Sequence, residues 1–385
     1  MQFNSRLRNR LAALALVAIA TAAAAALLWV ESERAILLLL LAIATAAFAA
    51  GRIGILTQLT QQALHYRRTI GTGAFLGILL ICFLFREDHF SLFLIGRVML
   101  ITLACLGLHL EFGAAGVVNF ASAAFFGVGG YSAAVLSAHT RIPHLLLLLS
   151  GGCASALIGS LLLLPLLRTR GHYAALITIA FGLLFRTFVE VNDSLGGPQG
   201  LKLGGFKILG LQFNEELAAA APFHASFYVN YVLLASVLVA GAFVLVQRLE
   251  SSWLGLALDA TRLDEVAAAS FGFEVARWKI LAFTLGNFLI GVAGALSAFM
   301  VGFLAPNNFT FPESLTLVSI VLLGGIGNAW GLALAAFLVV LLPEKLQILQ
   351  EYRYLLYAGL VLLILRFRPA GLIPRPMRRY FGHPA

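Results

Sequence analysis

The chain has 385 residues, of which 61% are hydrophobic and only 11% are charged, and its mean hydropathy is +0.95. Charged residues usually make up about a quarter of a soluble globular protein, so this composition excludes a water-soluble fold and indicates a polytopic membrane protein. The net charge of +9 does not indicate nucleic-acid binding, because the basic residues form short clusters beside apolar runs and no basic groove with interleaved aromatic residues is present.

Apolar runs follow one another along nearly the whole chain. A membrane-spanning helix needs roughly 20 such residues, and the sequence therefore predicts an all-α fold, a polytopic transmembrane helical bundle of about 10–12 spans. The first run follows the basic segment MQFNSRLRNR, but its length and the lack of a clear cleavage pattern favour an uncleaved span over a signal peptide. The runs cover residues 11–30, 35–51, 70–85, 91–110, 114–138, 144–167, 172–191, 228–247, 278–301, 313–325, 329–343 and 352–366.

Arginine and lysine residues gather on alternate connections between these runs. Basic clusters precede the first run and follow the second, sixth, eighth and last runs. The opposite connections contain the acidic or neutral segments ESER, REDH, VNDS and NNFTFPES. Because basic residues collect on the cytoplasmic side of a membrane, this pattern predicts that the N-terminus and the C-terminus are both cytoplasmic.

Two stretches rich in small residues interrupt the simple pattern of spans. Residues 113–132 read GAAGVVNFASAAFFGVGGYS, which fits either close helix packing alone or a broken helix beside a cavity. Residues 322–330 read LLGGIGNAW and fit either a re-entrant hairpin turn or a plain cytoplasmic connection.

The longest connection on the predicted outer side covers residues 191–225. Its turn-forming residues exclude a regular helix, and they include Gly196, Gly197, Pro198 and Gly200. About 30 residues is long for a passive connector. The segment therefore seats a partner on the outer side, acts as a gate, or only joins two spans.

A charged amphipathic segment, residues 251–283, lies between apolar runs on the predicted cytoplasmic side. Residues 256–271 contain good helix formers without proline or glycine, so they predict one surface helix that ends at Gly272. The polar positions of this helix are Asp259, Arg262, Asp264 and Glu265. We interpret the segment as a docking site for a cytoplasmic partner.

Motifs of nucleotide-binding, catalytic and metal sites are missing from the sequence. GxxxxGK[ST], HExxH, GxSxG and close His/Cys clusters are all absent, so we expect neither an enzyme nor a bound metal or cofactor. Cys82, Cys105 and Cys153 lie in apolar runs and are interpreted as small packing residues. Ionisable residues within spans are functional candidates by default, although long side chains also reach outward to the membrane surface. These candidates are Arg97, His109, Glu111 and Arg186.

Five sequence blocks between about Leu106 and Arg375 carry a family resemblance. They read EFGAAGVVNFASAAFFGVGGYSAAVL, HYAALITIAFGLLFRTFVEVNDSLGGPQGL, LDEVAAASFGFEVARWKILAF, FPESLTLVSIVLLGGIGNAWG and RFRPAGLIPR. Within the third block, residues 265–272 resemble the Glu-Ala-Ala loop of ABC importer permeases. In their order the five blocks resemble the branched-chain amino acid permeases of the LivM type, whereas the first 90 residues are similar only as hydrophobic spans.

The resemblance implies a type I ABC importer-like permease with a cytoplasmic coupling helix, in the inner membrane of a bacterial cell. Such a permease would move branched-chain or related amino acids inward with ATP hydrolysed by partner subunits. The implied partners are a LivH-like permease subunit, two cytoplasmic ABC ATPase subunits, a periplasmic solute-binding protein and membrane lipid, with no nucleic acid. The coupling residues would be Asp264, Glu265, Ala267, Ala268 and Gly272.

The family reading also divides the chain and assigns a path. Residues 1–90 would form N-terminal transmembrane helices, residues 91–375 the permease core with its coupling segment, and residues 376–385 a cytoplasmic tail. Residues 196–200 would belong to the periplasmic loop. The candidates for lining the translocation path are Gly113, Gly116, Asn119, Ser122, Gly127, Gly324, Gly325 and Gly327.

Two other functions fit parts of the sequence. A urea or short-chain amide permease would have similar membrane subunits, and the GGPQG turn leans only mildly toward the amino acid branch. A secondary transporter driven by an ion gradient would also be polytopic and glycine-rich. It would normally carry carboxylates at mid-membrane, whereas the acidic residues here fall almost entirely in predicted connections.

Overall fold

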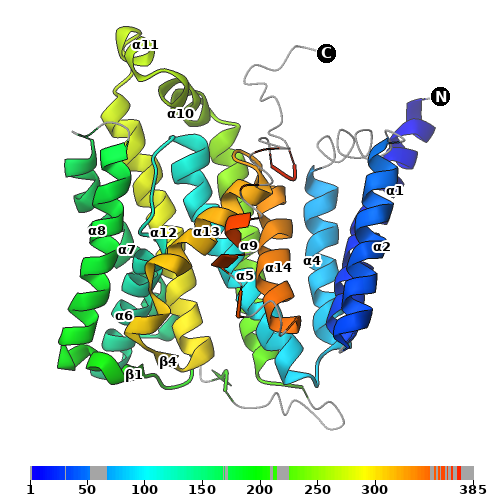
Figure 1. The fold of residues 1–385 in the computed structure, drawn as a ribbon, viewed down its shortest axis with the longest axis horizontal. Coiled ribbons are helices and arrows are strands. Elements are labelled where there is room, and N and C mark those ends of the chain that lie inside the picture. The colour runs from blue at the N-terminus through cyan, green and yellow to red at the C-terminus, as the bar shows by residue number, and fades with distance from the viewer. Residues whose placement is uncertain are drawn as a thin grey trace.

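The computed structural model describes residues 2–30, 32–52, 67–167, 172–208, 211–214 and 225–346, together with residue 169 and separate residues between 351 and 373. In these ranges the fold is a bundle of long helices that run side by side (Figure 1). The α-helices are α1 (Gln2–Trp29), α2 (Glu33–Arg52), α4 (Arg67–Leu84), α5 (His89–His109), α6 (Ser122–His139), α7 (His144–Leu166), α8 (His172–Val191), α9 (Tyr228–Glu250), α10 (Trp253–Leu263), α11 (Glu265–Ser270), α12 (Val275–Val301), α13 (Phe311–Gly324) and α14 (Ala329–Lys345). A π-helical turn, η1 (Leu110–Ala114), continues α5.

Short elements cap one end of this bundle. The 3-10 turns are η2 (Asp193–Leu195), η3 (Gly197–Gln199) and η4 (Pro306–Asn308), and the strands are β1 (Leu201–Lys202), β2 (Lys207–Ile208), β3 (Leu211–Gln212) and β4 (Phe303–Leu304). β1 pairs antiparallel with β4, with Leu201 opposite Leu304, and β2 pairs antiparallel with β3. We call this end the β1 end and the opposite one, beyond which α10 and α11 project, the α11 end (Figure 1).

Several described helices have the length and apolar character of membrane spans. Five of them do so over 18 residues or more: His89–Ala114, His144–Leu166, Tyr173–Val191, Tyr228–Glu250 and Val275–Val301. Two shorter apolar helical segments are Ala13–Trp29 and Thr69–Leu84. The predicted all-α polytopic bundle is therefore confirmed. Only separate residues of the predicted run 352–366 are described, so a span there stays a prediction.

α12 forms the centre of the bundle and packs against α5, α6 and α7. Small residues permit this close approach, as they commonly do between helices in membranes. A Cβ atom added at Gly291 would lie 2.6 Å from the carbonyl oxygen of Gly151 and 2.5 Å from the Cβ atom of Ser155, both on α7. Buried side chains such as Phe283 and Phe299 fill the space around α12.

The predicted span 114–138 is wrong at its start, because the chain is irregular between η1 and Ser122. Gly116 has a φ of +68°, a conformation that glycine adopts without steric cost. The side-chain oxygen of Asn119 accepts a hydrogen bond from the Ala121 backbone N–H at 2.8 Å, and such local bonds compete with helix formation. The chain is therefore broken before α6, as the broken-helix alternative expected, and a cavity beside the break stays a prediction.

The predicted single helix over residues 256–271 is in fact two helices. Asp264 is extended, with φ −155° and ψ 107°, and its carboxylate accepts hydrogen bonds from Val266 N–H at 2.9 Å and Ala267 N–H at 3.0 Å. Asp264 thereby ends α10 and caps the start of α11. The end of α11 agrees with the prediction, because Gly272 has a φ of +83°.

Within residues 322–330, residues 325–328 form a tight turn between α13 and α14, which have only 14 and 17 residues. The ring of Trp330 packs in a tilted arrangement on Phe243 of α9, with ring centroids 4.9 Å apart. The turn thus lies near the α11 end of the bundle (Figure 1). This position fits the plain connection between helices better than a hairpin tip inside the bundle.

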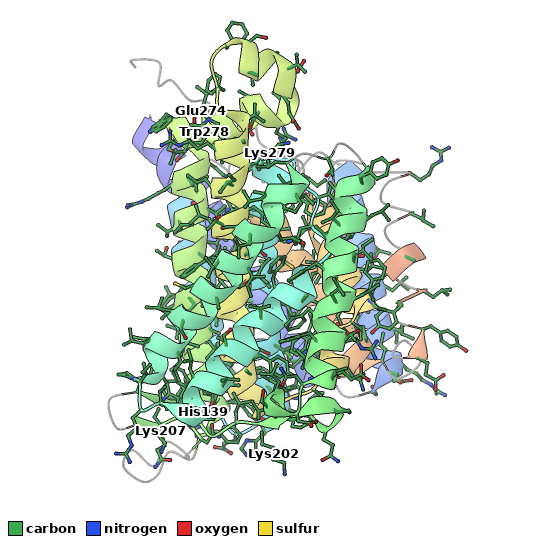
Figure 2. The ribbon with its side chains drawn as sticks, turned by 90° about the vertical axis from the view of Figure 1, so that its left-hand side faces the viewer. His139, Lys202, Lys207, Glu274, Trp278 and Lys279 are labelled. Carbon is green, nitrogen blue, oxygen red and sulfur yellow. The ribbon has the colours of Figure 1, made fainter. Side chains whose placement is uncertain are left out.

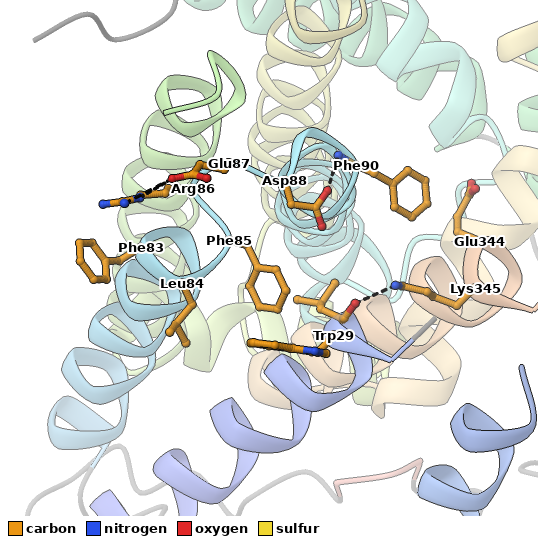
Figure 3. A pocket seen from close by; sticks show the side chains of 11 residues that line it. Trp29, Phe83, Leu84, Phe85, Arg86, Glu87, Asp88, Phe90, Glu344 and Lys345 are labelled. Carbon is orange, nitrogen blue, oxygen red and sulfur yellow. Dashed lines mark hydrogen bonds and ion pairs between the residues drawn. The ribbon is translucent and has the colours of Figure 1, made fainter. Parts of the chain in front are cut away.

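The helices α1 and α4 join the bundle beside α9 and α14. Figure 3 shows the hollow that lies between them at the β1 end. Lys345 on α14 donates a hydrogen bond to the Leu28 carbonyl oxygen at 2.7 Å, and Asp88 caps α5 by accepting from Phe90 N–H at 3.0 Å. The Lys345 contact attaches the end of α1 to α14, whereas the Asp88 cap stabilises the start of α5.

Candidate functional sites

The α10–α11 segment presents apolar side chains to its surroundings. α10 and α11 project beyond the other helices (Figure 1). The exposed fractions of Leu263, Val266 and Phe271 are 76%, 72% and 84%. Figure 2 shows the start of α12, with Glu274, Trp278 and Lys279, at this same end of the molecule. Exposed apolar residues gathered on one projection are typical of a protein–protein contact.

The predicted coupling residues all lie on or beside α11. Glu265 is exposed and forms an ion pair with Lys279 on α12, with 2.6 Å between Oε1 and Nζ. Ala268 is buried, whereas Gly272 has open space around it. The structure places these residues together, and their contact with an ATPase stays a prediction.

α10 rests on the irregular segment that follows η1. A Cβ atom added at Gly116 would lie 2.9 Å from Cγ of Arg262, so the glycine leaves room for the arginine side chain. At the base of α10, Trp253 packs edge-to-face on Trp278 of α12, with centroids 5.3 Å apart. α10 therefore contacts both the segment that follows η1 and the start of α12.

Two pairs of buried polar side chains lie just below α10. His109 Nε2 and Glu250 Oε1, from the ends of α5 and α9, are 2.9 Å apart, and His109 is fully buried. Asn119 donates a hydrogen bond to Glu111 Oε2 at 2.6 Å, and both residues are fully buried. Glu250 and Glu111 show that not all acidic residues lie in connections, since both belong to helical elements near the α11 end.

The predicted path residues are spread over several helix contacts. Gly113 lies against the His109 ring, Gly127 against Phe185 and Phe309, and Gly324 against the backbone of Gly331. Gly325 and Gly327 form the turn between α13 and α14, and Ser122 is buried at the start of α6. None of these residues lines the cleft described below, and their role in translocation stays a prediction.

A cleft of about 430 Å³ opens between α5, α6, α12, α13 and α14. Apolar side chains form most of its wall, and Arg97, Glu313 and Glu344 also line it. We call it the α5–α14 cleft. Among its charged residues the sequence singled out only Arg97, because Glu313 and Glu344 follow prolines at the edges of apolar runs and look like loop residues.

The other candidate residues have structural partners. Arg186 donates a hydrogen bond to Asn307 Oδ1 at 3.1 Å and lies 4.0 Å from Glu190, at the β1 end. Cys82 and Cys105 are buried as expected, whereas Cys153 is exposed on α7 and does not pack inside this chain. Among the residues that the structure describes, no three His, Cys, Asp or Glu side chains are grouped to hold a metal.

The predicted periplasmic residues lie at the β1 end. Gly196, Gly197 and Gly200 have positive φ angles and form the turns around η3, and the following β1 strand pairs with β4. Phe206, a little further on, is fully buried against His144 and Phe299. The described part of this long connection is thus packed onto the bundle, at the end opposite to α11.

Comparison with known proteins places the chain in a family. The family described as branched-chain amino acid transport system / permease component matches residues 90–365. The high-affinity branched-chain amino acid transport system permease proteins LivM of Salmonella typhimurium and Escherichia coli are each 34% identical over 282 residues, which is 70% of this chain and 66% of the relative. The probable branched-chain amino acid transport permease protein LivM of Methanocaldococcus jannaschii is 25% identical over 318 residues, or 70% of this chain and 89% of that protein. No solved structure matches.

The fold and the family match define the class of the protein. A bundle of apolar helices with a projecting surface segment is a multi-pass membrane protein of the transport permease class. The chain belongs to the family of branched-chain amino acid transport system permease components. The LivM-type resemblance expected from the sequence is thereby confirmed, and the chain spans slightly less than two thirds of the length of the first two relatives.

Proposed function

We propose that this chain is the membrane-spanning permease subunit of an ABC importer that moves branched-chain amino acids inward across the inner membrane. The observation that supports this most is the α10–α11 projection, where Leu263, Val266 and Phe271 are exposed on a segment that resembles a coupling helix. Because the sequence has no nucleotide-binding motif, energy has to enter through contact with separate ATPase subunits.

This function implies one orientation of the molecule in the membrane. The α11 end, near which the basic residues Arg248, Arg262, Arg277 and Lys279 lie, would face the cytoplasm. The β1 end would face the periplasm, where a solute-binding protein would dock near residues 196–200. A LivH-like second permease subunit and two ATPases would complete the complex. Closure of the ATPase pair would move α11 and α10 and, through Gly116 and Trp278, the helices below them.

The function is tested by reconstituting the chain in vesicles with its neighbouring permease subunit, ATPases and binding protein. We expect leucine to stimulate both ATP hydrolysis and uptake. Stimulation by urea alone would replace the amino acid with an amide as the substrate. If no ATP-dependent uptake of either solute were observed, while a proton or sodium gradient drove it, the chain would be a secondary transporter.

One substitution tests the docking surface itself. Val266→Asp places a charge on the exposed apolar face of α11, and burying an unpaired charge in an interface is costly. We expect the ATPase subunits to be lost from the purified complex. Val266→Thr keeps the shape of the side chain and serves as the matched control, with most of the ATPase retained. Equal ATPase content in the two variants would contradict docking at α11.

A further inference from the structure

The α5–α14 cleft combines an apolar wall with charges of both signs. Its wall includes Phe93, Leu100, Ile101, Phe126 and Met300, while the hydroxyl groups of Ser297 and Thr316 add polar positions. With a volume of about 430 Å³ the cleft falls within the size range of small-molecule sites. It also lies where five helices of the bundle meet, as sites within helix bundles commonly do.

The charges of the cleft form an ion pair across it. Arg97 Nη1 on α5 lies 2.5 Å from Glu344 Oε1 on α14. Neither side chain is sealed off, because 41% of Arg97 and 26% of Glu344 remain exposed. Glu313, in the first turn of α13, adds a second carboxylate, which accepts a hydrogen bond from Tyr354 at 3.0 Å. Ionisable residues in membrane-spanning helices are costly and usually mark substrate pathways.

We propose that the α5–α14 cleft is the site where the permease itself receives the amino acid as a zwitterion. Arg97 would bind the α-carboxylate, Glu344 the α-ammonium group, and the apolar wall the branched side chain. This inference rests on the proposed function and deepens it, because it assigns substrate recognition to residues of the permease. A guanidinium group suits this role, since it binds a carboxylate through two parallel hydrogen bonds.

The balance of charges supports transient binding. When the zwitterion enters, Arg97 leaves Glu344 and pairs with the carboxylate of the substrate, while Glu344 pairs with its ammonium group. No charge is left unpaired. An ionisable side chain that loses its partner within membrane-spanning helices is costly, and this exchange avoids that cost. The site would therefore hold its substrate weakly and release it readily, as a translocation path requires. A molecule lacking either charge would leave one residue of the pair without a partner and be excluded.

The same ion pair could instead serve only to fasten α5 to α14. The two roles differ in what happens when the charges are exchanged. The double variant Arg97→Glu with Glu344→Arg restores attraction between the helices and would restore transport if the pair were only a fastener. If the pair binds the zwitterion, transport by the double variant would stay defective, because the positions of the two charges relative to the apolar wall are reversed.

The test uses cysteine accessibility in the complete reconstituted transporter. Thr316→Cys places a thiol in the cleft, in a Cys153→Ser background, because Cys153 is the exposed one of the three native cysteines. We expect leucine to slow labelling by a methanethiosulfonate reagent. The leucine analogues 4-methylpentanoate, without the ammonium group, and 3-methylbutylamine, without the carboxylate, should give no protection. Lys202→Cys on β1 is the control, because Lys202 is exposed at the β1 end (Figure 2) and lies outside the cleft.

The charge variants complete the test. Arg97→Gln, Glu344→Gln and the exchanged pair should each weaken leucine protection by roughly tenfold or more, which is the loss expected from one charge-assisted bond. Glu87→Gln, which alters the exposed Arg86–Glu87 pair outside the cleft, should behave as the unmodified protein. Normal uptake by the charge-exchanged double variant, or protection by either analogue as strong as that by leucine, would overturn the inference. If the unmodified complex took up no leucine at all, the proposed function itself would fail.

Discussion

Asp264 determines the shape of the docking segment through one side chain. Its carboxylate caps α11 by accepting hydrogen bonds from two backbone N–H groups, at 2.9 and 3.0 Å. Asp264→Ala should cost the cap about 1 kcal/mol, the usual value for removing an N-cap residue. We expect faster hydrogen exchange of the Val266 and Ala267 amides, measured by mass spectrometry. Asp264→Asn keeps an accepting oxygen and should exchange nearly as slowly as the unmodified protein. Equal exchange in all three proteins would show that the cap does not stabilise α11.

At the scale of single residues, local chemistry was predictable and distant pairing was not. Gly272 was expected to end a helix and does so with a φ of +83°. Asp264 was assigned to a polar face, although its position before Glu265 and a run of alanines is also that of an N-cap. The partner of Arg97 could not be predicted from the sequence, because Glu344 lies 247 residues away along the chain. Only the packing of α14 on α5 brings the two side chains together.

At the scale of helices, close contacts between α12 and its neighbours hold the bundle together. Gly291→Ala would place a methyl group 2.6 Å from the Gly151 carbonyl oxygen and 2.5 Å from Ser155 Cβ, so α7 and α12 would have to separate. Overpacking of this kind typically costs roughly 1–3 kcal/mol. We expect a lower temperature of half-maximal recovery in size-exclusion chromatography after heating.

Gly241 on α9 provides the matched control for this substitution. No heavy atom lies within 4 Å of a Cβ atom added there. Gly241→Ala should therefore leave the thermal recovery unchanged or raise it, since alanine favours a helix over glycine. If Gly291→Ala were as stable as Gly241→Ala, the close approach of α7 to α12 would not contribute to the stability of the bundle.

Helix existence was predictable from apolar runs, but breaks within helices were less so. The runs at 228–247 and 278–301 correspond to α9 and α12 with ends displaced by three residues at most. The predicted start of α6 is eight residues too early. Val117 and Val118 are as apolar as the residues of a span, but Gly116 and Asn119 turn the chain there. Hydropathy measures transfer into the membrane and does not register such local turns.

At the scale of the whole molecule, the fold separates two kinds of surface. The α11 end carries a projecting segment with exposed apolar residues, whereas the β1 end carries packed turns and two short strand pairs. The polar pairs His109–Glu250 and Glu111–Asn119 lie between α10 and the centre of the bundle. The sequence predicts the segment to which a partner would dock but not the contacts below it, since these join α5 to α9 and η1 to the segment that follows it.

The contact between α10 and the segment after η1 should transmit movement from the docking surface. Gly116 has a φ of +68°, and a Cβ atom there would lie 2.9 Å from Cγ of Arg262. Gly116→Ala should therefore displace α10, and we expect leucine-stimulated ATP hydrolysis to fall while basal hydrolysis and ATPase content stay unchanged. Gly204→Ala, with no heavy atom within 4 Å of the added Cβ atom, is the control and should show normal stimulation.

Adding Arg262→Ala to Gly116→Ala separates two causes of a loss. Recovery of stimulation would show that the clash between the new methyl group and the Arg262 side chain is the cause. Continued loss would show that backbone strain at position 116 is the cause. Full stimulation in Gly116→Ala alone would exclude this contact from coupling.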